Sequence, residues 1–497
     1  MSVLALPLAV AACFLVDAPW DEPGVHRDRN PRILGLRAVL YGLLFLFWFQ
    51  FSWRPWLAGL STVLTVAVMV VVGRLKRHII GEPVVFTDFA LIKQVIRFPH
   101  LYYVTSFRVL GGLALVTAFT VAWYAAERPV TPRPWGLALA CVAGLPLLLY
   151  ASLRFGALAP VQAFLARLAP VPDLLPDVGR WGHVMTLAVY ALRWQGEGAR
   201  RTAPATPRPF GPGETPGFVV VVQLESFLDP VRLGGPSLPA LERLAAAALL
   251  HGRLAVPAHG AYTMRSEYAV LTGHDEATQG FGRYDPYLST RADVPDALPR
   301  LARARGLETV FVHPFGSTFF GRDRVIPQLG FERTVMEDAF TGAERHGPYV
   351  SDGATAARVL AEVRAARETG RRPFVFAVTM ENHGPWGAGR LPGIDDPREQ
   401  YLAHVANTGR AVEALLDGLA DLGPGLLCVY GDHPPSLPTC QPGFEGTRTD
   451  YAVVAFGESR PGRRLELTAA ELGRALQDLV AGRPLAAPSA AGIEAAA

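Results

Sequence analysis

The sequence predicts two parts: a multi-span α-helical membrane domain, followed by an α/β domain with a mainly parallel sheet. The first third of the 497-residue chain holds long apolar stretches, and a Pro- and Gly-rich segment follows at 196–216. Beyond it, short apolar strand patterns alternate with helical patterns, which is typical of βαβ units. We expect a membrane domain at 1–154, juxtamembrane helices and a linker at 155–216, the α/β domain at 217–482 and a disordered tail at 483–497.

The composition excludes some classes of partner. The formal net charge of +3 leaves no electrostatic footprint for a nucleic acid. The four cysteines are scattered and form no CxxC pair, so neither a zinc knuckle nor a disulfide framework is implied. The apolar first third instead predicts a lipid bilayer as a partner.

Five apolar segments are candidates for membrane spans: 3–16, 33–53, 56–73, 109–126 and 135–153. A bilayer core needs about 20 residues of helix. The segments are apolar on all sides, whereas the core helices of soluble domains have a polar face. Trp53, Trp56, Trp123 and Trp135 lie at segment ends, where an aromatic belt places them. The first segment lacks the basic n-region of a cleaved signal peptide.

The loop at 74–108 complicates the orientation, because it carries Arg74, Lys76, Arg77, Lys93, Arg97 and Arg108. Five spans with a cytoplasmic amino terminus place this loop and the α/β domain outside, which the positive-inside rule disfavours. Apolar parts of the loop fit the bilayer interface, which would bring the basic residues near lipid phosphates.

The periodicity predicts the elements in order. Short amphipathic segments at 161–168 and 183–194 fit the membrane surface. We expect strands at 218–224, 307–312, 373–379, 425–430 and 451–456. We expect helices at 238–250, 263–272, 296–305, 354–368, 398–421 and 468–480.

Three predicted strands end in potential metal ligands. Glu225 follows the first strand, Glu381-Asn382-His383 follows the third, and Asp432-His433 follows the fourth. In a parallel sheet, Glu225, His383, Asp432 and His433 would converge on one edge, and carboxylates and imidazoles bind divalent metals. Each residue alone has an ordinary alternative: Glu225 could cap a helix, His383 could be a loop histidine, and the Asp-His pair could form a turn.

Two further residues each have two interpretations. Thr263 begins a predicted helix, where it could simply cap the free N–H groups. It could also be a nucleophile, because the helix dipole and a metal lower the cost of an alkoxide. Arg322, which follows His313, could hold a phosphate as a charge-assisted fork or form a surface ion pair with Asp323.

The order of these motifs resembles the lipoteichoic-acid synthase family. The matching motifs are the strand-end Glu, a Thr at a helix start, His-x8-Arg, Asn-His-x-Pro and Tyr-Gly-Asp-His, over roughly residues 218–457. This family comprises membrane-anchored phosphoglycerol transferases of the alkaline phosphatase/sulfatase superfamily. The resemblance implies a sulfatase-like fold and one divalent metal, Mn²⁺ or Mg²⁺, held by Glu225, Thr263, Asp432 and His433. It also implies Thr263 as nucleophile, His383 as a second catalytic residue, and Arg322, His313, Phe320 and His383 as the substrate pocket.

The implied reaction moves a phosphoglycerol group from phosphatidylglycerol to a cell-envelope glycan or glycolipid through a phosphothreonine. His383 would protonate a leaving group or deprotonate the acceptor. The implied location is the inner cell membrane, with the catalytic domain extracytoplasmic. The Cys/Ser-x-Pro-x-Arg signature of sulfatases is absent, which disfavours sulfate ester hydrolysis. The alternatives are a phosphoethanolamine transferase, a hydrolase of the same superfamily, and an envelope scaffold that only binds glycan.

Overall fold

The computed structural model describes residues 2–17, 26–98, 107–131, 158–198, 209–290, 294–457 and 461–485, together with residues 136, 144, 147, 150 and 151. The chain forms two compact units, Met1–Thr202 and Ala203–Ala497.

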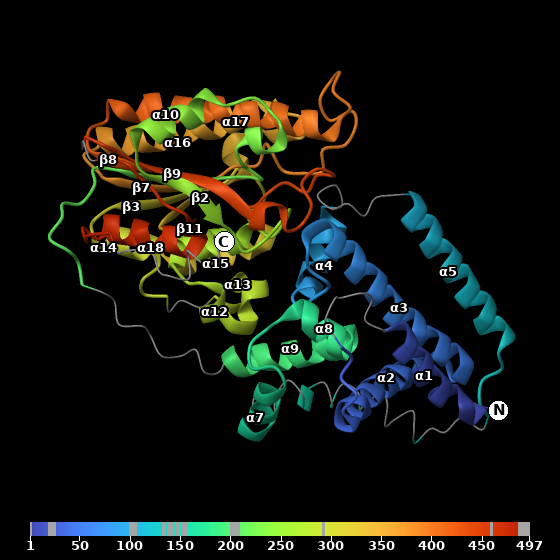
Figure 1. Ribbon diagram of the computed structural model, residues 1–497. Coiled ribbons are helices and arrows are strands. Elements are labelled where there is room, and N and C mark those ends of the chain that lie inside the picture. The colour runs from blue at the N-terminus through green and yellow to red at the C-terminus, as the bar shows by residue number, and fades with distance from the viewer. Residues whose placement is uncertain are drawn as a thin grey trace. The chain divides into compact units, whose positions relative to one another are not determined.

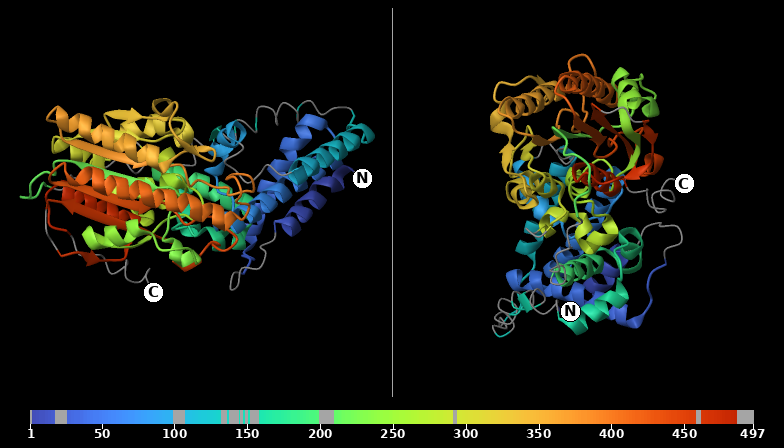
Figure 2. Two further views of the ribbon diagram at one scale, coloured as in Figure 1. Left: turned by 90° about the horizontal axis from the view of Figure 1, so that it is seen from above. Right: turned by 90° about the vertical axis from the view of Figure 1, so that its left-hand side faces the viewer.

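The first unit is helical (Figures 1 and 2). Its described helices are α1 Ala5–Val16, α2 Pro31–Ser52, α3 Pro55–Ile80, α4 Asp88–Arg97, α5 Phe107–Ala126, α7 Ala159–Leu168, α8 Leu174–Trp181 and α9 His183–Gly198. Helices α1, α2 and α3 pack against one another through buried apolar side chains that include Ala9, Phe45 and Ala58.

Among the described residues, α2 and α3 are long and apolar enough to cross a membrane. Helix α1 has 12 residues and is therefore about 18 Å long, which is shorter than a bilayer core of about 30 Å. Helix α5 carries a shorter apolar segment, Ala114–Ala126. The span expected at 135–153 lies almost entirely outside the described residues. Multi-span insertion is thus supported in part.

Helix α3 extends past the expected end at residue 73 and stops at Ile80. Arg and Lys are good helix formers, so the basic segment after the apolar stretch continues the helix. Gly81 then ends it in the left-handed conformation, with φ 84°. Part of the expected basic loop is therefore helix.

A buried polar cluster joins three helices of the first unit. Tyr41 Oη donates to Asp17 Oδ2 over 2.7 Å, and Arg37 Nη2 donates to Tyr41 Oη over 3.0 Å. The backbone N–H of His183 donates to Asp17 Oδ1 over 2.8 Å. Because unpaired buried charges are costly, these bonds fix the relative positions of the end of α1, the first half of α2 and the start of α9.

The second unit is built on one mixed sheet with the strand order β10-β2-β9-β8-β1-β7-β3-β4, to which β11 adds beside β2. Its strands are β1 Val219–Leu224, β2 Ala248–Ala255, β3 Glu308–Val312, β4 Arg333–Val335, β7 Pro373–Val378, β8 Gly425–Gly431, β9 Arg448–Phe456, β10 Arg463–Arg464 and β11 Leu467–Thr468; β5 Arg345–His346 and β6 Tyr349–Val350 form a separate hairpin. Strands β8, β1, β7, β3 and β4 are parallel, as expected. Strand β9 differs, because it pairs antiparallel with both β8 and β2.

Helices cover both faces of this sheet (Figure 1). One face carries α10 Pro239–Ala247, α16 Asp352–Glu368 and α17 Pro397–Ala420; the other carries α14 Leu298–Ala304, α15 Arg322–Leu329 and α18 Ala469–Val480, with the short α12 Glu276–Gln279 and α13 Pro286–Ser289 beyond them. Helix α11 Thr263–Thr272 packs against α14 and α18. Strand β1 is buried along its whole length between the two layers, which explains its continuous apolar sequence.

The register brings three strand ends to one level. Val221 of β1 pairs with Phe376 of β7 and with Cys428 of β8. Because neighbouring parallel strands in register end together, the residues that follow β1, β7 and β8 share one edge of the sheet.

The helix expected at 238–250 is wrong at its end. Helix α10 stops at Ala247, and the chain enters β2 at Ala248. The apolar residues at this junction suit either structure, and pairing of β2 with β9 decides in favour of the strand.

Candidate metal-binding active site

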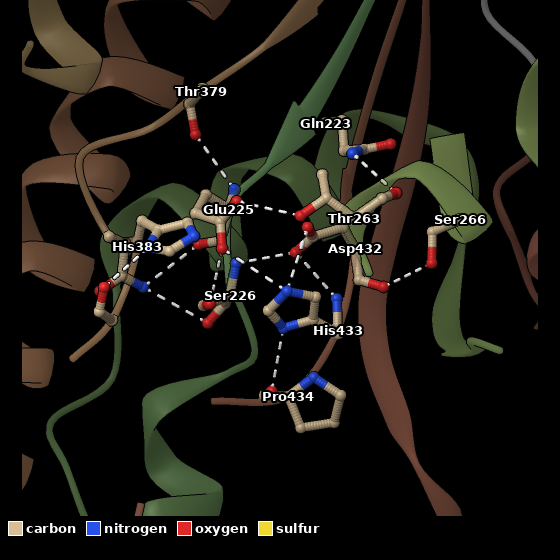
Figure 3. A network of polar contacts seen from close by, with 12 residues as sticks. Gln223, Glu225, Ser226, Thr263, Ser266, Thr379, His383, Asp432, His433 and Pro434 are labelled. Atoms are coloured by element: carbon tan, nitrogen blue, oxygen red, sulfur yellow. Dashed lines mark hydrogen bonds and ion pairs between the residues drawn. The ribbon is translucent and has the colours of Figure 1, made fainter. Parts of the chain in front are cut away.

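The carboxyl edge of the sheet collects the polar residues that follow its central strands. Glu225 follows β1, Asp432 and His433 follow β8, and His383 lies on the loop after β7. The backbone N–H of Asp432 donates to Leu224 O over 3.2 Å, so β1 and β8 stay paired to their ends. Figure 3 shows the side chains of Glu225, Asp432 and His433 turned toward one another.

Three of these side chains form a compact, buried group of metal-ligand types. Glu225, Asp432 and His433 each offer a ligand atom within 4.8 Å of the others. His433 Nε2 lies 3.5 Å from Glu225 Oε1 and 3.4 Å from Asp432 Oδ2. Two carboxylates and an imidazole are a donor set that suits several divalent cations.

The hydrogen bonds around the group prepare it for a cation. His433 Nδ1 lies 3.1 Å from Pro434 O, an acceptor, so Nδ1 carries the proton and Nε2 keeps its lone pair. Asp432 Oδ1 accepts from the backbone N–H groups of Ser226 and His433, each over 2.8 Å. Among the described residues, Asp432 Oδ2 is buried without a hydrogen-bond donor. The residues present therefore fit a bound divalent metal.

The electrostatics agree with this fit. Burial, and then the charge of Asp432, raises the pKa of Glu225 well above its ordinary value. Burial also raises the pKa of Asp432, against the opposing effect of His433. Two adjacent buried carboxylates without a cation are costly, and a divalent ion removes that cost.

Thr263 is placed beside this group by the start of α11. It is the first residue of the helix, and its Oγ1 donates to Glu225 Oε2 over 3.4 Å. The residue before it, Tyr262, adopts the left-handed conformation with φ 62°. One turn later, Ser266 Oγ donates to Asp432 O over 2.6 Å, which ties the helix start to the end of β8. The hydroxyl thus faces both the ligand group and the positive end of a helix.

The loop that carries His383 is held by Arg390, which donates to two backbone carbonyl groups of the loop. Arg390 Nη1 donates to His383 O over 2.5 Å and Nη2 donates to Glu381 O over 2.7 Å. His383 Nδ1 lies 2.7 Å from Gly384 O, an acceptor, so Nδ1 is protonated and proton exchange would occur at Nε2. The ring is half-buried and lies edge-on to Tyr349, 5.7 Å away between centroids.

Arg322 has a partner that the sequence interpretation did not anticipate. It is buried, and its Nη2 and Nε donate to the two carboxylate oxygens of Glu267 over 2.6 and 3.3 Å. The surface ion pair with Asp323 is therefore wrong. Glu267 also accepts from Tyr287 Oη. Because Glu267 lies four residues after Thr263, the pair joins α15 to the helix that carries the hydroxyl.

His313 and Phe320 surround the other end of Arg322. His313 Nδ1 lies 3.0 Å from Val378 O, and its Nε2 lies 3.1 Å from Arg322 Nη1. Burial, and then Arg322, holds the pKa of His313 well below its usual value, so it is a neutral acceptor for Arg322. The Arg322 guanidinium carbon lies 5.5 Å from the Phe320 ring centroid.

A second group of metal-ligand side chains is less suited to bind a cation. It consists of His346, Glu381 and His404. Its ligand atoms also lie within 4.8 Å of one another. However, Arg390 Nε donates to His404 Nε2 over 3.0 Å, and His404 Nδ1 lies 3.0 Å from Glu381 Oε1. A guanidinium already provides the positive charge there, so the group supports the His383 loop.

Sequence reasoning missed Glu267, Arg390 and Ser226. Glu267 is buried with zero exposed area, and its position one helical turn after Thr263 was the available signal. Arg390 and Ser226 act mainly through backbone groups, and such contacts leave no residue pattern.

Comparison with known proteins places the chain in a family. Residues 218–462 match the sulfatase family. The capsular polysaccharide biosynthesis protein RkpI of Rhizobium meliloti (strain 1021) is 33% identical over 464 residues, which cover 88% of this chain and 84% of that protein. A putative cyclic beta-1,2-glucan modification protein of the same organism is 29% identical over 239 residues, 44% of this chain and 36% of that protein.

A solved structure extends the likeness of the fold over both units. The integral membrane protein lipooligosaccharide phosphoethanolamine transferase A (EptA) from Neisseria meningitidis matches 97% of this chain and 96% of its own, with a TM-score of 0.50 and 14% identity. The chain belongs to the sulfatase family, within the alkaline phosphatase/sulfatase superfamily. This confirms the superfamily that the ordered motifs indicated.

Proposed function

We propose that this protein is a membrane-anchored, metal-dependent phosphotransferase that moves a phosphoglycerol group from phosphatidylglycerol to a cell-envelope glycan or glycolipid. The observation that carries the proposal is the position of Thr263. Thr263 is the first residue of α11, and its hydroxyl lies 3.4 Å from the carboxylate of Glu225, which belongs to a buried group that fits a divalent metal. A hydroxyl held in this way is suited to attack phosphorus.

The reaction would proceed in two displacements. A bound Mn²⁺ or Mg²⁺, held by Glu225, Asp432, His433 and Thr263, would favour the alkoxide form of Thr263 and neutralise phosphate oxygens. With the Thr263 proton released to solvent and His383 doubly protonated, Thr263 Oγ1 forms a bond to phosphorus while the bond to the diacylglycerol oxygen breaks, and His383 gives that oxygen a proton from Nε2. The acceptor hydroxyl then transfers its proton to His383, bonds to phosphorus and displaces Thr263.

The charges around the site favour a neutral head group over a cationic one. Glu225 and Asp432 are the carboxylates of the metal group, and Glu267 is paired with Arg322. Each of these three carboxylates is already used, either for the metal or for Arg322. The ammonium of an ethanolamine head group would need a further carboxylate as its partner. Glycerol hydroxyls need only hydrogen bonds. Nε and Nη2 of Arg322 are taken by Glu267, and Nη1 uses one of its two hydrogens on His313, so the second hydrogen of Nη1 suits a phosphate oxygen.

The names of the two relatives support the proposed acceptor class. One is named for capsular polysaccharide biosynthesis, and the other for modification of a cyclic glucan. Helices α2 and α3 would keep the enzyme at the bilayer that holds the lipid donor. Phosphatidylglycerol and such glycans meet outside the cytoplasm, so we place the catalytic unit there.

The test uses the full chain in vesicles that contain fluorescent phosphatidylglycerol, with Mn²⁺ added. We expect diacylglycerol release by the wild type, loss of release with Thr263→Ala, and partial retention with Thr263→Ser. Thr272→Ala is the matched control, because Thr272 lies at the opposite end of α11 and bonds to Tyr268 O over 2.7 Å. It should leave release unchanged.

The other outcomes discriminate the alternatives. Release from phosphatidylethanolamine alone would replace phosphoglycerol with phosphoethanolamine. Free glycerol phosphate formed equally with and without glycan would indicate a hydrolase. No release from either lipid and no bound metal would contradict an enzyme and favour a scaffold.

A further inference from the structure

Helix α4 exposes an apolar stripe. None of its ten residues is buried. Phe89, Ile92 and Ile96 are 49%, 49% and 75% exposed. They are three and seven residues apart, so they lie on one face of the helix. A stripe of three large apolar side chains on one short helix requires an apolar partner.

The start of α4 is fixed at the end of a candidate membrane span. Lys76, in the last two turns of α3, forms an ion pair with Asp88 over 2.6 Å and donates to Pro83 O over 3.1 Å. The Val85 N–H donates to Asp88 Oδ2 over 2.9 Å. A spanning helix leaves the hydrocarbon where its basic residues begin, which in α3 is at Arg74. These contacts therefore place the start of α4 at the depth of the lipid head groups.

The charges of α4 are arranged beside the stripe. At about 100° per residue, Ile92 and Ile96 lie on one side of Phe89, whereas Lys93 and Arg97 lie on the other, about 40° and 80° away. Lys93 and Arg97 are both exposed. The acidic residue of the helix, Asp88, is paired with Lys76. The exposed face thus combines apolar and basic side chains, which fits an anionic bilayer surface.

We propose that α4 lies in the head-group region of the bilayer, with Phe89, Ile92 and Ile96 among acyl chains and with Lys93 and Arg97 on the phosphates of anionic lipids. A protein interface fits this face less well, because the cores of protein interfaces are depleted in Lys. This inference does not depend on the transfer reaction. If that reaction also holds, α4 binds the chemical class to which the donor belongs, an anionic phospholipid.

The experiment places a spin label on α4 of the full chain in phosphatidylglycerol nanodiscs. Ile92→Cys and Ile96→Cys are labelled in a Cys141→Ala background, because Cys13, Cys428 and Cys440 are buried. Oxygen reports contact with acyl chains and a nickel chelate reports contact with water. We expect oxygen to relax both labels several-fold more than nickel does. A label at Asp417, whose side chain is 67% exposed on the second unit, should show the reverse.

A second comparison tests the charges. A basic residue near an anionic surface contributes about a five-fold preference. Lys93→Glu with Arg97→Glu should therefore lower the oxygen-to-nickel ratio at residue 96 in phosphatidylglycerol discs and leave it unchanged in phosphatidylcholine discs. Arg364→Glu on α16 is the matched charge reversal and should leave the oxygen-to-nickel ratio at residue 96 unchanged.

Two results would overturn the proposal. Stronger relaxation by nickel than by oxygen at residues 92 and 96, in the chain that keeps Lys93 and Arg97, would mean that this face of α4 is in water. Weak relaxation by both reagents would mean that another protein or a second copy covers it.

Discussion

Two residues at the site hold backbone conformations that side chains usually disfavour. Tyr262, directly before Thr263, has φ 62°, and Ser226, directly after Glu225, has φ 49°. The Arg265 guanidinium carbon lies 4.2 Å from the centroid of the Tyr262 ring, which helps to hold this conformation. Strain of this kind is kept where the surrounding structure enforces it, often at functional sites. We infer that Tyr262 aims the Thr263 hydroxyl.

This inference predicts opposite results for two changes at Tyr262. Tyr262→Gly accepts a positive φ without steric cost, so turnover should stay within several-fold of the wild type. Tyr262→Val places a β-branched residue where it is least tolerated, at a cost of about 1–2 kcal/mol, and should lower kcat by about ten-fold or more. Bound metal, measured by elemental analysis, should be the same in both. Equal kcat values for the two variants would contradict the role.

Asp352 is a buried carboxyl with an incomplete set of partners. Its Oδ2 accepts from Thr408 Oγ1 over 2.6 Å, whereas Oδ1 is buried without a donor among the described residues. Burial, and then the charge of Glu381, raises its pKa from 3.8 to about 7. The folded protein therefore keeps this proton over a pH range in which the unfolded chain has lost it.

The proton on Asp352 makes the free energy of unfolding depend on pH. Between pH values of about 4 and about 7 the folded state binds more protons, so Asp352 makes the free energy of unfolding fall as the pH rises through this window. Asp352→Asn removes the effect. The melting temperature of the variant minus that of the wild type should increase from about pH 4 to about pH 7 and then level off. A difference that does not vary with pH would show that this carboxyl does not titrate as described.

At the scale of elements, the expected and observed structures agree where the local pattern is unambiguous. The sequence predicted a helix at 263–272, and α11 has these bounds. It predicted a strand at 425–430, and β8 occupies Gly425–Gly431. Strand β4 was missed, because its three residues are too few for a periodic signal and depend on pairing with β3. Side-chain partners across elements, such as Glu267 and Arg322, were equally inaccessible, because 55 residues separate them.

The Glu267–Arg322 pair predicts non-additive stability changes between α11 and α15. Glu267→Leu leaves a buried guanidinium without its carboxylate, which should lower the free energy of unfolding by about 3–5 kcal/mol. Adding Arg322→Met removes that charge and should restore most of the loss, because apolar replacements of buried pairs are often neutral. Thermal unfolding of the full chain in detergent is measured for the wild type, for Glu267→Leu, for Arg322→Met and for the double variant. A double variant whose loss is at least the sum of the two single losses would contradict direct pairing.

At the scale of the whole molecule, the charge pattern and the predicted chemistry gave opposite expectations for the side of the membrane on which the catalytic unit lies. The basic loop at 74–108 conflicted with an external catalytic unit. Lys76 is paired with Asp88, and Arg77 lies in the last turn of α3, where it stabilises the negative end of the helix dipole. Some of these charges therefore have local partners, which weakens their use as markers of the cytoplasmic side. The external location stays a prediction.

Metal binding should control the stability of the second unit. Without a cation, Glu225 and Asp432 are adjacent buried carboxylates, and burial raises the pKa of both. An ion that binds only the folded state stabilises it by about 2.7 kcal/mol at one hundred times its dissociation constant. Mn²⁺ should therefore raise the melting temperature of the wild type above its value in chelator. Asp432→Asn removes one charge of the pair, so in chelator this variant should melt at or above the wild type and should respond little to Mn²⁺. A wild type whose melting temperature is insensitive to Mn²⁺, Mg²⁺ and Zn²⁺, or a variant that responds as strongly as the wild type, would contradict a metal site at the carboxyl ends of β1 and β8.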